Sequence, residues 1–176
     1  MKIRISLLLA LTLALSGCGQ AESTEDTWSD AVRIEFSDDS VTVDGNAASA
    51  DSAVYTENDI IFYLEGQGVT YGEGTEADAH SQAEADAHTV VHITQPGTYV
   101  LSGELSAGQI AVDLGEGAET DPEAVVTLVL DGVDITCTVA PAVMFYRVYE
   151  CGSTDGDAAS WEVDTSTAGA NIMIAD

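Results

Sequence analysis

The stretch Ile93–Val112, "ITQPGTYVLSGELSAGQIAV", decides how this chain folds. Its apolar residues alternate with small or polar ones, which is the period typical of β-strands. The dipeptides Pro96-Gly97, Ser102-Gly103 and Ala107-Gly108 interrupt the apolar runs, and glycine adopts the backbone angles that tight turns need. The stretch therefore predicts a strand, a turn, a second strand, another turn and a third strand.

Short strands of the same kind recur on both sides of this stretch. They are rich in Val and Ile, and no long amphipathic helix separates them. Runs such as "VVTLVL" are too continuous for a sheet with one wet face, so we expect strands that are covered on both faces. The expected class is all-β, and the pattern alone leaves open a β-sandwich, a barrel or a parallel β-helix. The segments concerned are "VRIEFSDDSVTVDG", "AVYTENDIIFYLEG", "AVVTLVLDGVDITC", "PAVMFYRVYEC" and "ANIMIAD".

Residues 66–88 break the strand pattern. This segment is rich in Gly, Ala and acids, and it predicts a surface excursion with one short helix near Glu76 to Asp86. It contains the repeated motif "ADAH", which places His80 and His88 eight residues apart with His92 nearby. Transition-metal sites on helices use closer spacing, so we predict a solvated polar loop here.

The N-terminus has the pattern of an export signal. Lys2 and Arg4 precede an apolar run, and "LSGC" closes it at Cys18. This ending resembles the bacterial lipobox, in which the cysteine is lipidated and becomes the new N-terminus. We therefore predict a lipoprotein signal peptide at 1–17, lipid attachment at Cys18, a flexible tether at 18–30 and one domain at 31–176. The protein would be held at the outer face of the bacterial cell membrane.

The chain is strongly acidic. It has 31 Asp and Glu residues against 4 Lys and Arg, a formal net charge of −27. Cleavage before Cys18 leaves two basic residues, Arg33 and Arg147, so the mature charge is 2 − 31 = −29. Such a surface repels nucleic acid and anionic lipid. Two interpretations stay open at this point, a calcium-binding face and acidic solvation that keeps the protein soluble.

Three phrases resemble a known family. "ITQPGTYVLSGELSAGQIAVDL", "VTLVLDGVDITC" and "VDTSTAGANIMIAD" are similar, in family order, to secreted bacterial carbohydrate-binding-domain-containing proteins. The resemblance runs from about Val32 to the last residue. It implies a right-handed parallel β-helix that binds plant cell-wall polysaccharides such as polygalacturonate and cellulose without cleaving them, with calcium in the structure. In this fold we expect Leu128, Leu130, Val133 and Ile135 to face a stacked core, with Asp131-Gly132 as the corner between them.

The chain departs from the family at its C-terminus. Relatives continue beyond "AGANIMIAD" with several more rungs, so we expect a truncated form that holds the first few rungs, and a last strand with an open edge. The family's binding and calcium sites would then lie largely beyond Asp176. No binding residue is therefore transferred from the family by position.

Catalysis is disfavoured by the shortage of basic residues. A β-helical lyase needs an Arg or Lys base, and Arg147 is expected instead to pair with Glu150 or to lie along the surface. Hydrolysis needs two carboxyl groups that face each other across a cleft, and with 31 acids that signal has almost no specificity. We predict that the protein is not an enzyme.

Candidate site residues are few. Asp155 and Asp157 form a weak calcium motif, because clustered oxygens suit this ion but the remaining ligands of a calcium loop are absent. Trp161 and Tyr149 are the candidate sugar contacts. Cys137 and Cys151 would form a disulfide outside the cell that closes a loop of about 15 residues.

The sequence thus predicts a lipid-anchored protein that binds extracellular polysaccharide. Calcium on acidic corners would bridge to anionic uronates, with avidity along a repetitive face. The alternatives are a polysaccharide lyase or hydrolase of the β-helix class, and an acidic structural or adhesin-like envelope protein. The sequence leaves the oligomeric state and the glycan open.

Overall fold

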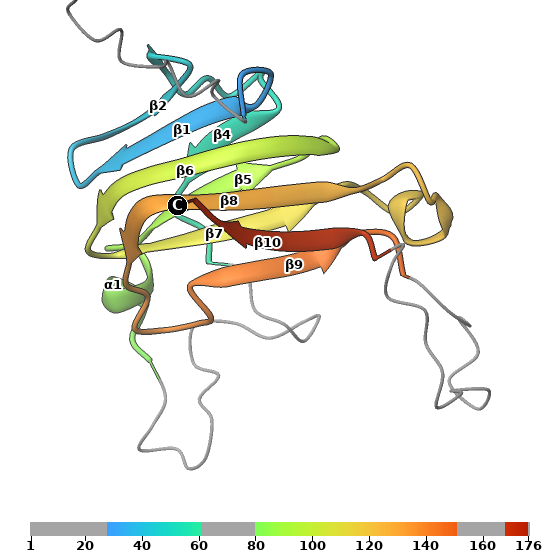
Figure 1. The fold of residues 1–176 in the computed structure, drawn as a ribbon. Coiled ribbons are helices and arrows are strands. Elements are labelled where there is room, and N and C mark those ends of the chain that lie inside the picture. The colour runs from blue at the N-terminus through green and yellow to red at the C-terminus, as the bar shows by residue number, and fades with distance from the viewer. Residues whose placement is uncertain (1–27, 61–79, 151–167, 176) are drawn as a thin grey trace, which may run out of the picture.

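The computed structural model describes residues 28–60, 80–150 and 168–175 (Figure 1). These residues form ten strands, one short α-helix and one 3-10 helix. The elements are β1 (Val32–Ser37), β2 (Ser40–Val43), β3 (Asn46–Ala47), β4 (Val54–Glu57), α1 (Gln82–Ala85), β5 (Thr89–Ile93), β6 (Gly97–Leu105), β7 (Gly108–Asp113), η2 (Ala118–Thr120), β8 (Val126–Ile135), β9 (Val143–Arg147) and β10 (Ala170–Ile174). The all-β prediction is confirmed.

The strands form two mixed sheets. Sheet A has the order β10-β8-β6-β1-β2-β3, and sheet B has the order β4-β5-β7-β9. From β5 onward, successive strands alternate between the sheets, and each strand from β7 to β10 pairs in parallel with the strand two positions before it. The chain therefore winds back and forth between the two sheets, as Figure 1 shows for β5 to β10.

Antiparallel strands complete both sheets at the N-terminal side. β1 and β2 form a hairpin, β3 adds to β2, and β4 adds to β5. A turn at Asp44-Gly45 joins β2 to β3, and both residues have positive φ, 49° and 76°. Glycine adopts this left-handed backbone readily and aspartate tolerates it, so both residue types suit the turn.

One aliphatic core lies between the sheets. In sheet A, Ile34 aligns with Leu101, which in turn aligns with Leu130 on the next strand. In sheet B, Ile110 aligns with Val91 on one side and with Val143 on the other. All six belong to, or pack against, a single cluster contributed by both sheets. Because a buried aliphatic side chain contributes about 1.5–3 kcal/mol, these aligned residues hold the two sheets together.

The expected core residues of β8 are confirmed with a gradient of burial. Leu128 is fully buried, and Leu130, Val133 and Ile135 pack half-buried against the core. Burial also decreases toward β10, where Ile172 aligns with Leu128 and is nevertheless 56 % exposed.

Two glycine positions differ from the expected turns. Ser102-Gly103 and Asp131-Gly132 lie inside β6 and β8, where turns between separate strands were predicted. Gly103 has a φ of 91° and Gly132 a φ of 67°, and the β6–β8 register shifts between Leu101 and Gly103. The positive angles therefore produce a bulge that bends each strand without ending it.

The outer face of sheet B is covered at one end. Ala85 of α1 and Val139 of the segment after β8 pack with Val90 and Ala111 of the sheet, and Ile60 completes this cluster. The cover extends from Val90, near the start of β5, to Ala111 on β7, which is the cross-strand partner of His92. The other end of the same face carries polar and aromatic side chains.

Candidate functional site

The polar end of the outer face of sheet B gathers residues from four strands. Tyr55 of β4 is the cross-strand partner of His92 on β5, and Asp113 of β7 is the partner of Arg147 on β9. Val112, the neighbour of Asp113, points into the core, so Asp113 points outward. We call Tyr55, His92, Asp113, Tyr146 and Arg147 the sheet B strip.

His92 and Tyr55 form the first half of the strip. Their rings stack with centroids 4.6 Å apart and an interplanar angle of 7°. His92 is 7 % exposed, and its Nε2 is a buried side-chain atom without a hydrogen-bond partner in the described part of the chain. Glu57 Oε2 lies 3.9 Å from this nitrogen, which is beyond hydrogen-bond distance.

The pKa of His92 is lowered, and the cause is burial. Desolvation disfavours the imidazolium, and the nearby charges of Glu57, Asp113 and Asp59 offset only part of that effect. The same surroundings raise the pKa of Tyr55, first through burial and then through Glu57 and Asp113. Both shifts favour the neutral forms of the stacked rings.

Asp113 and Arg147 form the second half. Arg147 Nε donates to Asp113 Oδ1 at 2.7 Å, and Nη2 donates to Oδ2, so the contact is bidentate. Burial alone would raise the pKa of Asp113, but hydrogen bonds from Arg147 and from the Gly115 amide outweigh it and hold the pKa low. The expected pairing of Arg147 with Glu150 is wrong, because strand pairing brings a carboxylate 34 residues away into register.

Tyr146 lies next to this ion pair. The guanidinium carbon of Arg147 is 5.3 Å from the centroid of the Tyr146 ring, within cation–π distance. The register between β7 and β9 shifts after Val112, and Tyr146 is the extra residue of that bulge. The strip thus combines three aromatic rings, those of Tyr55, His92 and Tyr146, with a bidentate ion pair.

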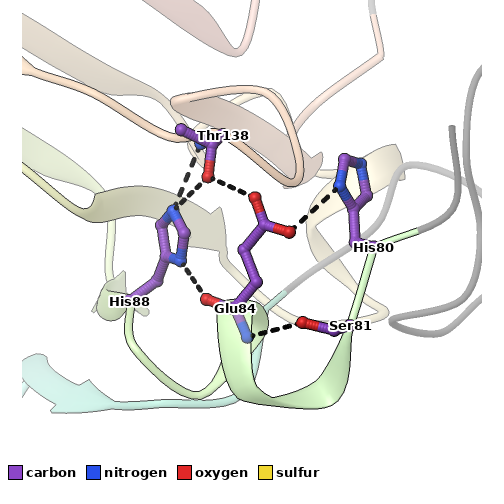
Figure 2. A network of polar contacts seen from close by, with 5 residues as sticks. All are labelled: His80, Ser81, Glu84, His88 and Thr138. Carbon is purple, nitrogen blue, oxygen red and sulfur yellow. Dashed lines mark hydrogen bonds and ion pairs between the residues drawn. The ribbon is translucent and has the colours of Figure 1, made fainter.

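A second polar cluster lies between α1 and the segment after β8 (Figure 2). Ser81 caps this helix by accepting from the Glu84 amide at 3.2 Å. His88 Nδ1 lies 2.8 Å from the Glu84 carbonyl oxygen, and His88 Nε2 accepts from the Thr138 amide at 3.2 Å. A carbonyl can only accept, so His88 is the Nδ1–H tautomer and both of its nitrogens are paired.

This cluster corrects one expectation of the sequence. His88 is 3 % exposed, so the second "ADAH" motif ends in a buried anchor and not in a solvated loop. Thr138 Oγ1 also donates to Glu84 Oε1 at 3.1 Å, while His80 Nδ1 lies 3.8 Å from Glu84 Oε2. The cluster therefore ties α1 to the segment after β8. Within 28–60, 80–150 and 168–175, no three metal-ligating side chains come together.

Most predicted site residues lie outside the described residues. Their structural roles stay predictions, and they are Cys18, Cys151, Asp155, Asp157 and Trp161. Tyr149 is half-buried, and its backbone is held by Ala124 and Gly169. Cys137 is half-buried and packs against the cluster that contains Val139, and its pairing with Cys151, which lies outside the described residues, stays a prediction.

Sequence reasoning did not find the sheet B strip. Asp113 was one acid among 31, and Tyr55 was one tyrosine among six. His92 was noted only as a neighbour of the "ADAH" motifs. The missing information was the strand register, which joins residues 34 to 37 positions apart in the chain.

Comparison with known proteins supports one broad class. A family model described as "Carbohydrate-binding domain-containing protein" matches residues 87–154. The matched segment includes β5 to β9, and with them four of the five residues of the strip. This similarity supports carbohydrate binding in general. No match was found among curated proteins or among solved structures.

Proposed function

We propose that this protein is a non-catalytic binder of extracellular polysaccharide. The observation that carries the proposal is the similarity to carbohydrate-binding-domain-containing proteins over residues 87–154. The matched segment includes five of the six strands that alternate between the two sheets, and it contains four of the five residues of the sheet B strip.

The proposed architecture is a parallel β-helix with short rungs. Support comes from the alternation of strands between two sheets, from parallel pairing of each strand with the one two positions before it, and from aliphatic residues aligned across strands. In solenoids of this type each tier contacts only its neighbours, which creates an extended surface suited to a long polymer.

The proposed location is the outer face of the bacterial cell membrane. A lipid on Cys18 and a tether at 18–30 would display the sheets outside the cell. Among the described residues, no helix is long and apolar enough to span a membrane. Replacing Cys18 by Ser should release the protein from the membrane fraction, and retention of this variant would contradict the lipid anchor.

Absence of catalysis is supported by the state of Arg147. Its guanidinium donates two hydrogen bonds to Asp113, which raises the pKa of Arg147 still further. A lyase base has to lose its proton, and this arginine is held in the protonated form. Incubation with polygalacturonate should therefore release neither reducing nor unsaturated ends, and release of either would establish an enzyme.

Binding is tested by pull-down on insoluble polysaccharides, both neutral and uronic, with and without a calcium chelator. Retention of the protein on at least one polysaccharide supports the proposed function. If no polysaccharide retains it, the proposed function is wrong and an envelope protein without a glycan ligand is favoured. The proposal includes calcium near Asp155 and Asp157 as a bridge to uronates. Loss of uronate binding on chelation would support that part, and unchanged binding would remove it.

A further inference from the structure

We propose that the sheet B strip is the glycan contact surface, and that it selects uncharged sugar residues over uronates. This inference rests on the proposed function, since it names the site and the sugar class of the same binding activity. It is argued from the ion pair, from the unpaired imidazole nitrogen and from the charge around them.

The Asp113–Arg147 pair has the geometry that sugar hydroxyls require. Its side chains are 27 % and 31 % exposed, so they are reachable from outside while each holds the other in place. A carboxylate accepts and a guanidinium donates, so two adjacent hydroxyls can bond to both. Because the pair is already ordered, binding would cost little side-chain entropy.

Tyr55, Tyr146 and His92 supply the rest of a sugar site. Tyrosine offers an apolar ring face and a polar end, which suits the mixed surface of a sugar. His92 Nε2 lacks a hydrogen-bond partner among the described residues, although such buried groups are rarely left unpaired. Glu57 is 58 % exposed and lies 3.9 Å from it, so a hydroxyl that displaces this side chain can bond to the nitrogen.

The charge around the strip decides the sugar class. The positive charge of Arg147 is neutralised by Asp113, while Glu57 and Asp59 act on His92 and Glu116 acts on Arg147. The other arginine of the described chain, Arg33, lies on β1 of sheet A. A uronate would therefore meet uncompensated carboxylates, whereas a neutral sugar meets hydrogen-bonding groups without that repulsion.

The test compares a neutral glucan oligosaccharide with a galacturonate oligosaccharide of equal length, at low salt and without calcium. Titration calorimetry of the full chain should show binding of the neutral oligosaccharide in preference to the acidic one. Asp113→Asn removes the charge that neutralises Arg147, so it should raise the affinity for the galacturonate oligosaccharide by roughly fivefold. Tyr146→Ala should weaken binding of the neutral oligosaccharide by about tenfold.

Asp131→Asn is the matched control, because it makes the same charge change at an exposed position on sheet A. It should leave both affinities near those of the unmodified chain. An equal effect of Asp113→Asn and Asp131→Asn would overturn the site, and so would unchanged neutral binding by a folded Tyr146→Ala variant. Preference of the unmodified chain for galacturonate would overturn the sugar class. In each of these cases glycan binding itself persists, whereas absence of all binding would contradict the proposed function.

Discussion

At the scale of single residues, the lowered pKa of His92 leads us to expect a fold that is sensitive to mild acid. This pKa lies below the ordinary 6.5 because burial disfavours the charged ring. Below pH 6.5 the unfolded chain therefore binds a proton more readily than the folded chain does, and acid favours unfolding. The contribution of the neutral His92 ring to stability is therefore complete above pH 6.5. It is lost as the pH falls through the lowered pKa that His92 has in the folded state.

We predict that the free energy of unfolding falls as the pH is lowered from above 6.5 toward 5. His92→Phe keeps a ring against Tyr55 and removes the titrating group, so its profile should be flatter across this interval. Urea denaturation at a series of pH values measures both profiles. The pKa of Asp113 is lowered from 3.8, so Asp113 loses its contribution to stability only below about pH 3.8. The effects of His92 and Asp113 on stability therefore fall in different pH ranges. Parallel profiles for the two proteins would contradict the assignment to His92.

Substitutions at Gly103 and Gly132 separate two costs of adding a Cβ, the strain of a positive φ and the steric clash with neighbouring atoms. Both have positive φ, but a Cβ at Gly103 would lie 2.2 Å from the Phe36 carbonyl oxygen, whereas one at Gly132 meets nothing within 4 Å. Gly132→Ala should therefore cost about 1 kcal/mol from the backbone angle alone. Gly103→Ala should cost about 3 kcal/mol, because β1 has to move away as well. Urea denaturation measures both, and equal costs would contradict the close approach of β1 and β6.

At the scale of elements, the buried His88 connects α1 to the segment after β8. We predict that His88→Ala speeds amide hydrogen exchange at Thr138 by about tenfold, because that amide loses its acceptor. His80→Ala is the matched control, since His80 contacts Glu84 only at 3.8 Å and near the surface. Amide hydrogen exchange, measured residue by residue, gives the rate at Thr138 in each variant. Equal exchange in the two variants would show that His88 does not hold this segment.

Elements were predicted better than their junctions and the site. The period-2 pattern located β1 and β2, the continuous apolar run located β8, and the acid- and Ala-rich segment located the short helix. Gly103 and Gly132 were interpreted as turns because glycine favours positive φ. The sequence does not show whether strand pairing continues through such a residue. The sheet B strip was not predicted for a related reason. A bond between Arg147 and Asp113 depends on the register of β7 and β9, and no local pattern encodes that register.

At the scale of the whole molecule, the excess of acids opposes folding. A net charge of −27 creates repulsion that the compact state concentrates. Salt screens this repulsion over a Debye length of about 10 Å at 0.1 M. We predict that raising sodium chloride from low to physiological strength increases the free energy of unfolding by about 1 kcal/mol.

A variant with fewer charges provides the control. Glu35, Asp131 and Asp134 are exposed on sheet A, and replacing them by Gln, Asn and Asn lowers the repulsion without touching the core. Its stability should respond less to salt than that of the unmodified chain in the same urea titrations. An identical salt response would indicate that dispersed charge does not limit stability.

The alternation of strands between two sheets repeats a backbone path, but it does not repeat a surface. At the polar end of sheet B, the partly exposed side chains Tyr55, Asp113 and Arg147 lie on β4, β7 and β9, and they differ in size and charge. A polymer lying across these strands would therefore meet a sequence of unlike neighbours and would have a preferred direction along the stack. Each molecule would then engage its ligand in a single orientation, so several copies bound to parallel polymer chains would all face the same way.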